Sequence, residues 1–203
     1  MNVNRRTQAD RTAVTRNALI DAGRRLFGER GYAAVGTEEI ARDAGVTRGA
    51  LYHQFADKQA LFGAVFEALE EAVLIEIATQ AASDDDGPVN ALRRSVSAWL
   101  NACERPEVQR IILLDAPGVL GWETWREIAE RYALGATIIL LQTAIDTGAI
   151  APQPVRPLAH ILIGALDEAA LYVARADDRD AARREVEVVL DRLLAGITAP
   201  ASA

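Results

Sequence analysis

The sequence predicts an all-α protein of about nine helices. Half of the 203 residues are hydrophobic, whereas Gly and Pro are sparse at 14 and 7 residues, which is typical of a mostly helical globular chain. Apolar residues recur at helical spacing between the Gly and Pro breaks. Residues 37–54 also read as two short helices around a glycine turn, a helix-turn-helix pattern.

Composition and charge indicate a cytoplasmic protein without a membrane segment. Residues 1–11 lack the apolar core of a signal peptide, and no apolar run reaches the ~18 residues that span a bilayer. The single cysteine excludes an internal disulfide, as expected in a reducing compartment. The net charge is −7, but residues 1–60 carry ten Arg/Lys against seven Asp/Glu. The N-terminal part is therefore basic and suits contact with phosphate.

Two segments precede the helix-turn-helix. Residues 1–11 are expected to form a flexible tail, or alternatively a basic arm that follows DNA. A first helix is expected over residues 12–31, ending at Gly31. The apolar face of this helix contains Ala18, Leu19, Ala22, Leu26 and Phe27.

The helix-turn-helix covers residues 37–54, and a third helix begins after it. Thr37 is expected to cap its first helix with its hydroxyl. Gly45 follows that helix, where a left-handed residue commonly ends a helix. Thr47 caps the second helix, which can lie in the major groove of DNA. Asp57 caps the next helix, with Lys58 in its first turn.

These residues resemble the DNA-binding domain of TetR-family transcriptional regulators. The resemblance implies a flexible tail over 1–11, a helix-turn-helix domain over 12–60, and a ligand-binding and dimerisation domain over 61–198. The expected architecture is three N-terminal helices followed by six C-terminal ones. The matching residues are Leu26 to Tyr32, Thr37, Ile40-Ala41, Ala44-Gly45-Val46, Leu51-Tyr52, Phe55, Lys58 and Leu61.

The second helix of the motif offers few side chains to DNA. The fork of Arg48 matches guanine O6 and N7, Gly49 allows close backbone approach, and Ala50 is small enough for a thymine methyl group. The helix N-termini at Thr37 and Thr47 suit phosphate. The full set of expected DNA contacts is Thr37, Thr47, Arg48, Gly49, Ala50, Tyr52, His53 and Lys58.

Structural alternatives remain open for several of these residues. Thr37 and Thr47 can act only as caps, Tyr52 can pack internally, and His53 can be an ordinary surface histidine. Arg48 can pair with Asp43 or Glu38 instead of a base.

The C-terminal part reads as a series of helices. The segment 83–88 is expected to be a solvated loop, because aspartates at a helix C-terminus oppose the helix dipole. Ala116-Pro117-Gly118 is expected to break the chain. The expected helices cover residues 57–82, 88–104, 106–115, 122–147, 157–176 and 178–196.

The last two helices, within about residues 157–197, form the expected homodimer interface. In the resembled family, these helices pair with their copies in a four-helix bundle. One side of each helix must nevertheless face the internal core. The apolar stripes contain Leu158, Ile161, Leu162, Ala165, Leu166 and Ala169, and then Val186, Val189, Leu190, Leu193, Leu194 and Ile197.

A small-molecule site is expected in the C-terminal part, because regulators of the resembled family commonly release DNA when such an effector binds. The segment from Arg110 to Trp125 resembles a motif found in one subset of these regulators. Aromatic walls with few polar groups are typical of ligand pockets, although aromatics at helical spacing also serve as core. The expected ligand-binding residues are Trp99, Arg110, Asp115, Trp122, Trp125 and Asp167.

No catalytic constellation or metal-ligand cluster stands out, since the only histidines are His53 and His160 and the only cysteine is Cys103. We therefore expect neither an enzyme nor a cofactor or metal requirement. The preferred function is a repressor that binds a pseudo-palindromic, double-stranded DNA operator as a homodimer. The alternatives are a helical protein-interaction module, or an activator without a small-molecule response.

Overall fold

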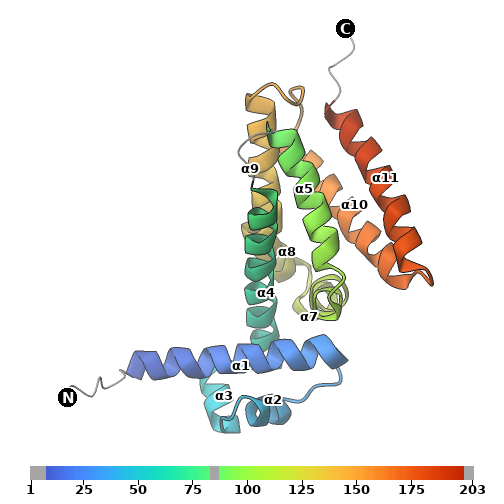
Figure 1. The fold of residues 1–203 in the computed structure, drawn as a ribbon. Helices are drawn as coiled ribbons and strands as arrows, with labels where there is room; N and C mark the ends of the chain where they lie inside the picture. Colours follow the sequence, from blue (N-terminus) through green and yellow to red (C-terminus); the bar gives the residue numbers. More distant parts are fainter. Residues whose placement is uncertain (1–7, 83–86, 199–203) are drawn as a thin grey trace, which may run out of the picture. The chain divides into compact units, whose positions relative to one another are not determined.

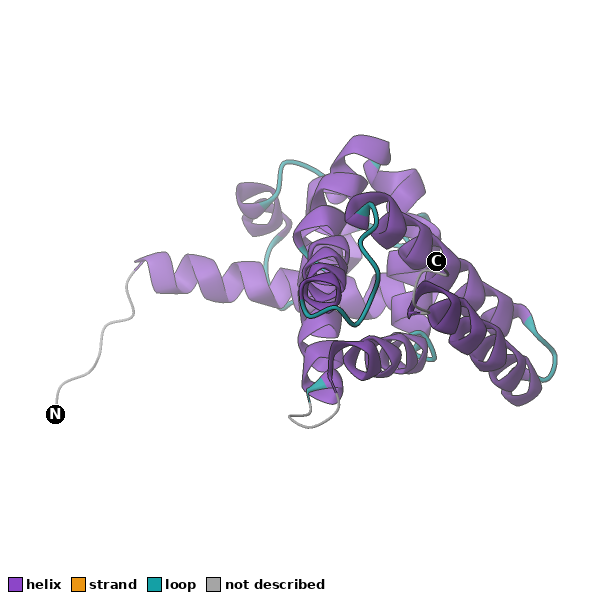
Figure 2. Ribbon diagram, turned by 90° about the horizontal axis from the view of Figure 1, so that it is seen from above, coloured by secondary structure: helices purple, strands orange, loops and turns teal. Residues whose placement is uncertain are grey.

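The described part of the chain is all-α, as the sequence predicts. The computed structural model describes residues 8–82 and 87–198, and within these ranges it contains helices and loops but no strand (Figure 2). The helices are α1 Gln8–Arg30, α2 Thr37–Asp43, α3 Arg48–Gln54, α4 Lys58–Ala81, α5 Gly87–Ala102, α6 Pro106–Val108, the π-helix η1 Gln109–Asp115, α7 Ala116–Leu120, α8 Trp122–Arg131, α9 Ala133–Asp146, α10 Val155–Arg175 and α11 Arg179–Thr198.

The chain forms two compact units. One contains residues 1–69 and 106–125, and the other contains residues 70–105 and 126–203. The first unit extends into α4 and also includes residues 106–125. This compact unit is therefore larger than the DNA-binding domain expected over 12–60. The functional boundary after residue 60 remains a prediction.

In the first unit, α1 packs against α2 and α3 (Figure 1). Apolar residues at helical spacing on each element supply the core. The rings of Phe27 and Phe62 are 5.3 Å apart and both contact Tyr32. The other buried residues include Leu19, Ala22, Val35, Ile40, Ala41, Leu51, Leu61, Val65 and Phe66.

In the second unit, α10 packs against α9 and α11, and α5 packs against α9, α10 and α11. The buried residues there include Leu92, Val96, Leu100, Leu134, Leu141, Ile150, Leu162, Val186, Leu190 and Leu194. The stripe predicted on α11 therefore divides, since these last three residues face the core while Val189 and Leu193 stay exposed.

Two expected helix boundaries are wrong. The helix expected over 122–147 is interrupted at Tyr132, whose backbone leaves helical geometry. Ala116-Pro117-Gly118 does not break the chain but begins α7, because proline is tolerated in the first helical turn, where its missing N–H is not needed. In addition, the helix expected over 106–115 is divided into α6 and the π-helix η1, and these three differences account for the elements beyond the expected nine within the described residues.

The start of the first helix also differs, because α1 already includes Gln8. Residues 8–11 contain no Gly or Pro and therefore extend the helix into the expected tail. Residues 1–7 of that tail, and residues 83–86 of the expected aspartate loop, lie outside the described residues.

Candidate DNA-binding surface and effector region

The N-terminus of α3 is built as the sequence predicts. Gly45 has a φ of +68°, a conformation that glycine adopts without the steric cost of a side chain. The Thr47 hydroxyl accepts a hydrogen bond from the Ala50 N–H at 3.2 Å, so Thr47 is confirmed as the cap of α3. Gly45 and Thr47 together set the direction in which α3 leaves the turn.

Burial divides the residues of α3 into two faces. Leu51 is completely buried, whereas Arg48, Gly49, Tyr52 and His53 are exposed. The hydrophobic side thus anchors α3 on α1 and α2, and the opposite side presents groups that can contact a base or a phosphate.

Thr37 is not the cap that the sequence suggests. The helix α2 begins at Thr37, its N-cap residue is Gly36, and no side chain caps it. The Thr37 hydroxyl instead lies 3.1 Å from the Tyr52 hydroxyl. Tyr52 is 43% exposed, so it does not pack internally. Hydrogen bonding to Thr37, and then to Arg48, lowers the pKa of Tyr52.

Arg48 has a partner within the protein. Its guanidinium donates to the Glu38 carboxylate and lies 5.5 Å from the centre of the Tyr52 ring. Asp43, the other partner considered from the sequence, pairs with Arg25 instead. Both Arg48 and Glu38 are exposed, and such ion pairs are weak in water. The pair therefore holds Arg48 at the surface without excluding a base.

Lys58 also has a contact within the protein. Its ammonium lies 4.0 Å from the centre of the Tyr32 ring, close enough for a cation–π interaction. Burial lowers the pKa of Lys58. This contact offsets the unfavourable position of a cation at a helix N-terminus. The presence of Lys58 in the first turn of α4 therefore does not require a bound phosphate.

The six residues expected to bind an effector divide between the two units. Arg110, Asp115, Trp122 and Trp125 belong to the first unit, while Trp99 and Asp167 belong to the second. In the first unit, Asp115 accepts a hydrogen bond from the Tyr32 N–H at 2.7 Å. The rings of Trp122 and Trp125 are 5.3 Å apart. The six residues remain a prediction as a ligand site, and the hydrogen bond gives Asp115 a structural role.

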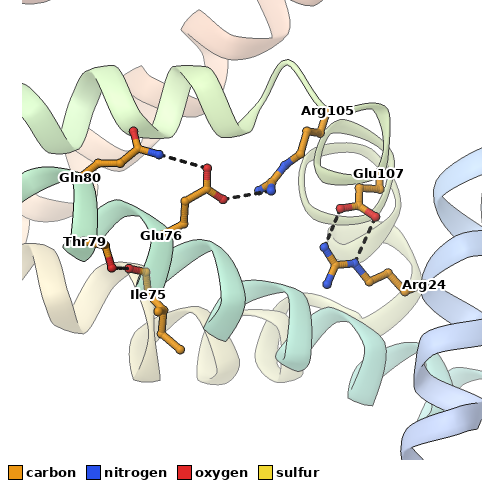
Figure 3. Close-up of polar contacts among 7 residues, drawn as sticks. All are labelled: Arg24, Ile75, Glu76, Thr79, Gln80, Arg105 and Glu107. Atoms are coloured by element: carbon orange, nitrogen blue, oxygen red, sulfur yellow. Dashed lines mark hydrogen bonds and ion pairs between the residues drawn. The ribbon is translucent and has the colours of Figure 1, made fainter.

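A second polar link in the first unit joins α1 to α6. Arg24 donates to both carboxylate oxygens of Glu107, at 3.1 and 2.6 Å (Figure 3). This bidentate geometry is the strongest form of an arginine–carboxylate pair. Together with Asp115 and Tyr32, it fixes the segment 106–115 against α1.

In the second unit, two carboxyl groups are removed from water. Glu70 on α4 is only 6% exposed, and Asp167 on α10 is partly buried. Burial, and then the charge of Asp167, raises the pKa of Glu70 to about 8. Burial also raises the pKa of Asp167 to about 7, against the opposing charge of Arg126. Strongly shifted carboxyls of this kind often mark functional sites.

Glu70 was missed in reading the sequence, although a signal was present. It lies four residues after Phe66 and three before Val73, both fully or almost fully buried residues of α4. This spacing places a glutamate on the apolar face of the helix.

Comparison with known proteins identifies the family. Residues 19–65 match the model of the bacterial regulatory proteins of the tetR family, and residues 89–197 match that of the tetracyclin repressor-like C-terminal domain. The chain belongs to the TetR family. It is similar to the solved TetR-family transcriptional regulator from Pectobacterium atrosepticum, with 31% identity over 96% of this chain and 99% of that one, at a TM-score of 0.80.

Two curated proteins are also similar to this chain. The chain is 25% identical to the Transposon Tn10 TetC protein of Escherichia coli, over 79% of this chain and 81% of that protein. It is 38% identical to the transcriptional repressor BepR of Brucella suis, over 53% of this chain and 51% of that protein. Like its family, the chain is therefore a DNA-binding transcriptional regulator, with α2 and α3 inside the N-terminal match.

Proposed function

We propose that this chain is a repressor that binds a pseudo-palindromic operator as a homodimer and leaves it when a small molecule binds the C-terminal region. The observation that carries the DNA-binding part is the outward face of α3, where Arg48, Gly49, Tyr52 and His53 are exposed around a capped N-terminus. The repressor role is supported by the similarity to BepR.

The homodimer is supported by apolar residues that remain exposed on the last two helices. They are Ile161 and Tyr172 on α10, and Val188, Val189 and Leu193 on α11, each between 48% and 69% exposed. Apolar surface concentrated in this way on a monomer marks an interaction site. A second copy of the same face would cover it symmetrically.

The same proposal accounts for the apolar character of α10. This helix is long and apolar enough to cross a membrane by length and composition, with a mean hydropathy of 1.3. Since α10 packs against α9 and α11 and also carries part of the proposed interface, we assign its outer face to the partner subunit and place the protein in the cytoplasm.

The test measures binding to the DNA that flanks the protein's own gene by fluorescence anisotropy over a salt series. We expect tight binding that weakens steeply with salt, because counterions are released from phosphates. The double variant Arg48→Ala with Tyr52→Ala should lose this binding, whereas Arg179→Ala, an exposed arginine at the start of α11, should retain it. Flanking DNA that bound no more tightly than random DNA would leave two readings, an operator elsewhere in the genome or an interaction module.

A further inference from the structure

Arg48 is held from two sides by other residues of the helix-turn-helix. Its Nη1 donates a hydrogen bond of 2.5 Å to Oε1 of Glu38, in the first turn of α2. Its guanidinium carbon lies 5.5 Å from the centre of the Tyr52 ring, one turn later in α3. Tyr52 is itself linked to α2, because its hydroxyl lies 3.1 Å from that of Thr37. The direction of Arg48 is therefore set by contacts that join α2 to α3.

The carboxylate of Glu38 is unexpected on a side that meets phosphate. The side chains of Arg48 and Glu38 are 59% and 71% exposed, so their ion pair contributes little to stability. A carboxylate at this position also repels the DNA backbone. Neither folding nor phosphate binding accounts for Glu38, and its effect on Arg48 is the remaining role.

The hydrogen bond to Glu38 leaves the base-reading edge of Arg48 available. A guanidinium group carries five N–H donors, and the Glu38 carboxylate engages Nη1. The N–H groups on Nε and Nη2 lie on another edge, and a fork of this kind matches guanine O6 and N7. Arg48 can therefore keep its contact with Glu38 while it reads a guanine.

Phosphate competes with guanine for the same donors, and Glu38 acts against phosphate. The phosphate oxygens carry negative charge, which the carboxylate repels, whereas guanine O6 and N7 are uncharged acceptors. Phosphates flank every base pair, so an arginine that turns toward them adds affinity without sequence information. A carboxylate beside Arg48 thus favours the base over the backbone.

We propose that Glu38 is a specificity-determining residue of this regulator, which positions Arg48 for a guanine base and keeps it away from the phosphate backbone. The inference rests on the proposed function, in which Arg48 contacts DNA, and it names the base and the residue that directs the contact. Glu38 acts through Arg48. Because Arg48 is already held in place, it also loses less conformational freedom when it binds.

The first part of the experiment determines which bases the full chain selects. Wild type, Arg48→Ala and Glu38→Gln are each incubated with a pool of randomised duplex DNA, and the bound duplexes are sequenced. We expect the wild type to enrich a guanine at a position where Arg48→Ala shows no preference. Glu38→Gln should weaken the preference for this guanine by about threefold or more and leave the other selected positions unchanged.

The second part is a double-mutant cycle, measured by fluorescence anisotropy on the enriched duplex and on a random duplex. Glu38→Gln should raise the affinity for the random duplex more than that for the enriched one, so the ratio of the two affinities falls. In the Arg48→Ala background, the same substitution should raise both affinities alike and leave the ratio unchanged, since there is no arginine to position.

Two controls separate positioning from charge and from folding. Glu29→Gln removes the same charge from an exposed position of α1, and it should change both affinities by the same factor. Urea unfolding of Glu38→Gln should match that of the wild type, because the ion pair is exposed.

Two results overturn the proposal: an unchanged guanine preference in Glu38→Gln, or a fall in the affinity ratio that persists in the Arg48→Ala background. Failure of the proposed function is distinguishable from these. A wild-type chain that enriched no sequence would overturn the proposed function and this inference together. A guanine preference lost in Arg48→Ala but kept in Glu38→Gln would overturn this inference alone.

Discussion

The hydroxyls of Thr37 and Tyr52 lie 3.1 Å apart and join the first turn of α2 to α3. Both residues were expected to contact DNA, and both belong to the helix-turn-helix. Their hydrogen bond fixes the direction of the Tyr52 ring, on which Arg48 also lies. The geometry of the DNA-binding side is therefore set by contacts among the same residues that are proposed to use it.

The first prediction separates this internal role from DNA contact. Tyr52→Phe and Thr37→Val each remove the hydroxyl pair. We expect both variants to fold as stably as the wild type in urea unfolding, because the pair is exposed. Tyr52→Phe should weaken DNA binding on all sequences alike, since a phosphate contact is lost, and it should leave the salt dependence unchanged, because the hydroxyl carries no charge. If binding weakened for the operator alone, or not at all, a phosphate role for Tyr52 would be wrong.

The second prediction concerns the ion pair between Arg48 and Glu38. Glu38→Gln releases Arg48 from its carboxylate and removes a negative charge from the DNA-binding side. We expect a higher affinity for DNA at low salt, and a smaller difference as salt screens the charge. Glu29→Gln, an exposed glutamate on α1, controls for net charge. An unchanged affinity for Glu38→Gln would show that the pair does not compete with DNA.

The sequence was sufficient for the fold class and for the turn of the helix-turn-helix. Gly45 and Thr47 act through short-range geometry, which a local pattern records, and both behave as expected. Thr37 was assigned wrongly as a cap because a threonine before an apolar helix has the same pattern whether its hydroxyl turns toward its own helix or toward Tyr52. The helix break at Tyr132 was not predicted because no proline lies near it in the sequence.

The effector region was harder to predict because it depends on contacts between distant segments. Asp115 and Asp167 were both predicted to bind the effector. Asp115 instead accepts a hydrogen bond from the Tyr32 N–H, 83 residues away in the chain. Glu70 and Asp167 influence each other across an even longer separation in the chain. Periodicity places each on a helical face, but it does not say which faces meet.

The third prediction tests the close approach of α1 and α6. A Cβ atom at Gly28 would lie 2.7 Å from the Cβ of Glu107, which is closer than packed atoms tolerate. We expect Gly28→Ala to lower the free energy of unfolding by about 1–3 kcal/mol, measured by urea unfolding. Gly118→Ala, where no atom lies within 4 Å of the added carbon, is the control and should not destabilise. Equal stability of both variants would mean that α6 can move away without cost.

The fourth prediction is a pH dependence of stability in the ligand-free protein. The pKa of Glu70 rises from 4.5 to about 8 on folding, so the native state keeps a proton that the unfolded chain releases. This contribution is complete below the unfolded pKa and is lost as the pH rises toward 8. It is on the order of a few kcal/mol at most.

Unfolding in urea at pH 5 and pH 8 measures this dependence. Glu70→Gln should reduce the loss of stability at the higher pH, because glutamine stays neutral. Glu71→Gln should leave the loss unchanged. A wild-type protein that became more stable between these pH values, with Glu70→Gln behaving alike, would contradict the assignment to Glu70.

The fifth prediction addresses the proposed dimer. Leu193 on α11 is 48% exposed, so a charge there is compatible with a folded monomer but not with an apolar interface. Leu193→Glu should shift the protein from dimer to monomer in sedimentation velocity, and operator binding should weaken because two recognition helices no longer act together. Ile139→Glu places the same charge at a 68% exposed residue of α9 and should remain dimeric. If Leu193→Glu stayed dimeric, the face formed by α10 and α11 would not be the interface, and their exposed apolar residues would need another partner.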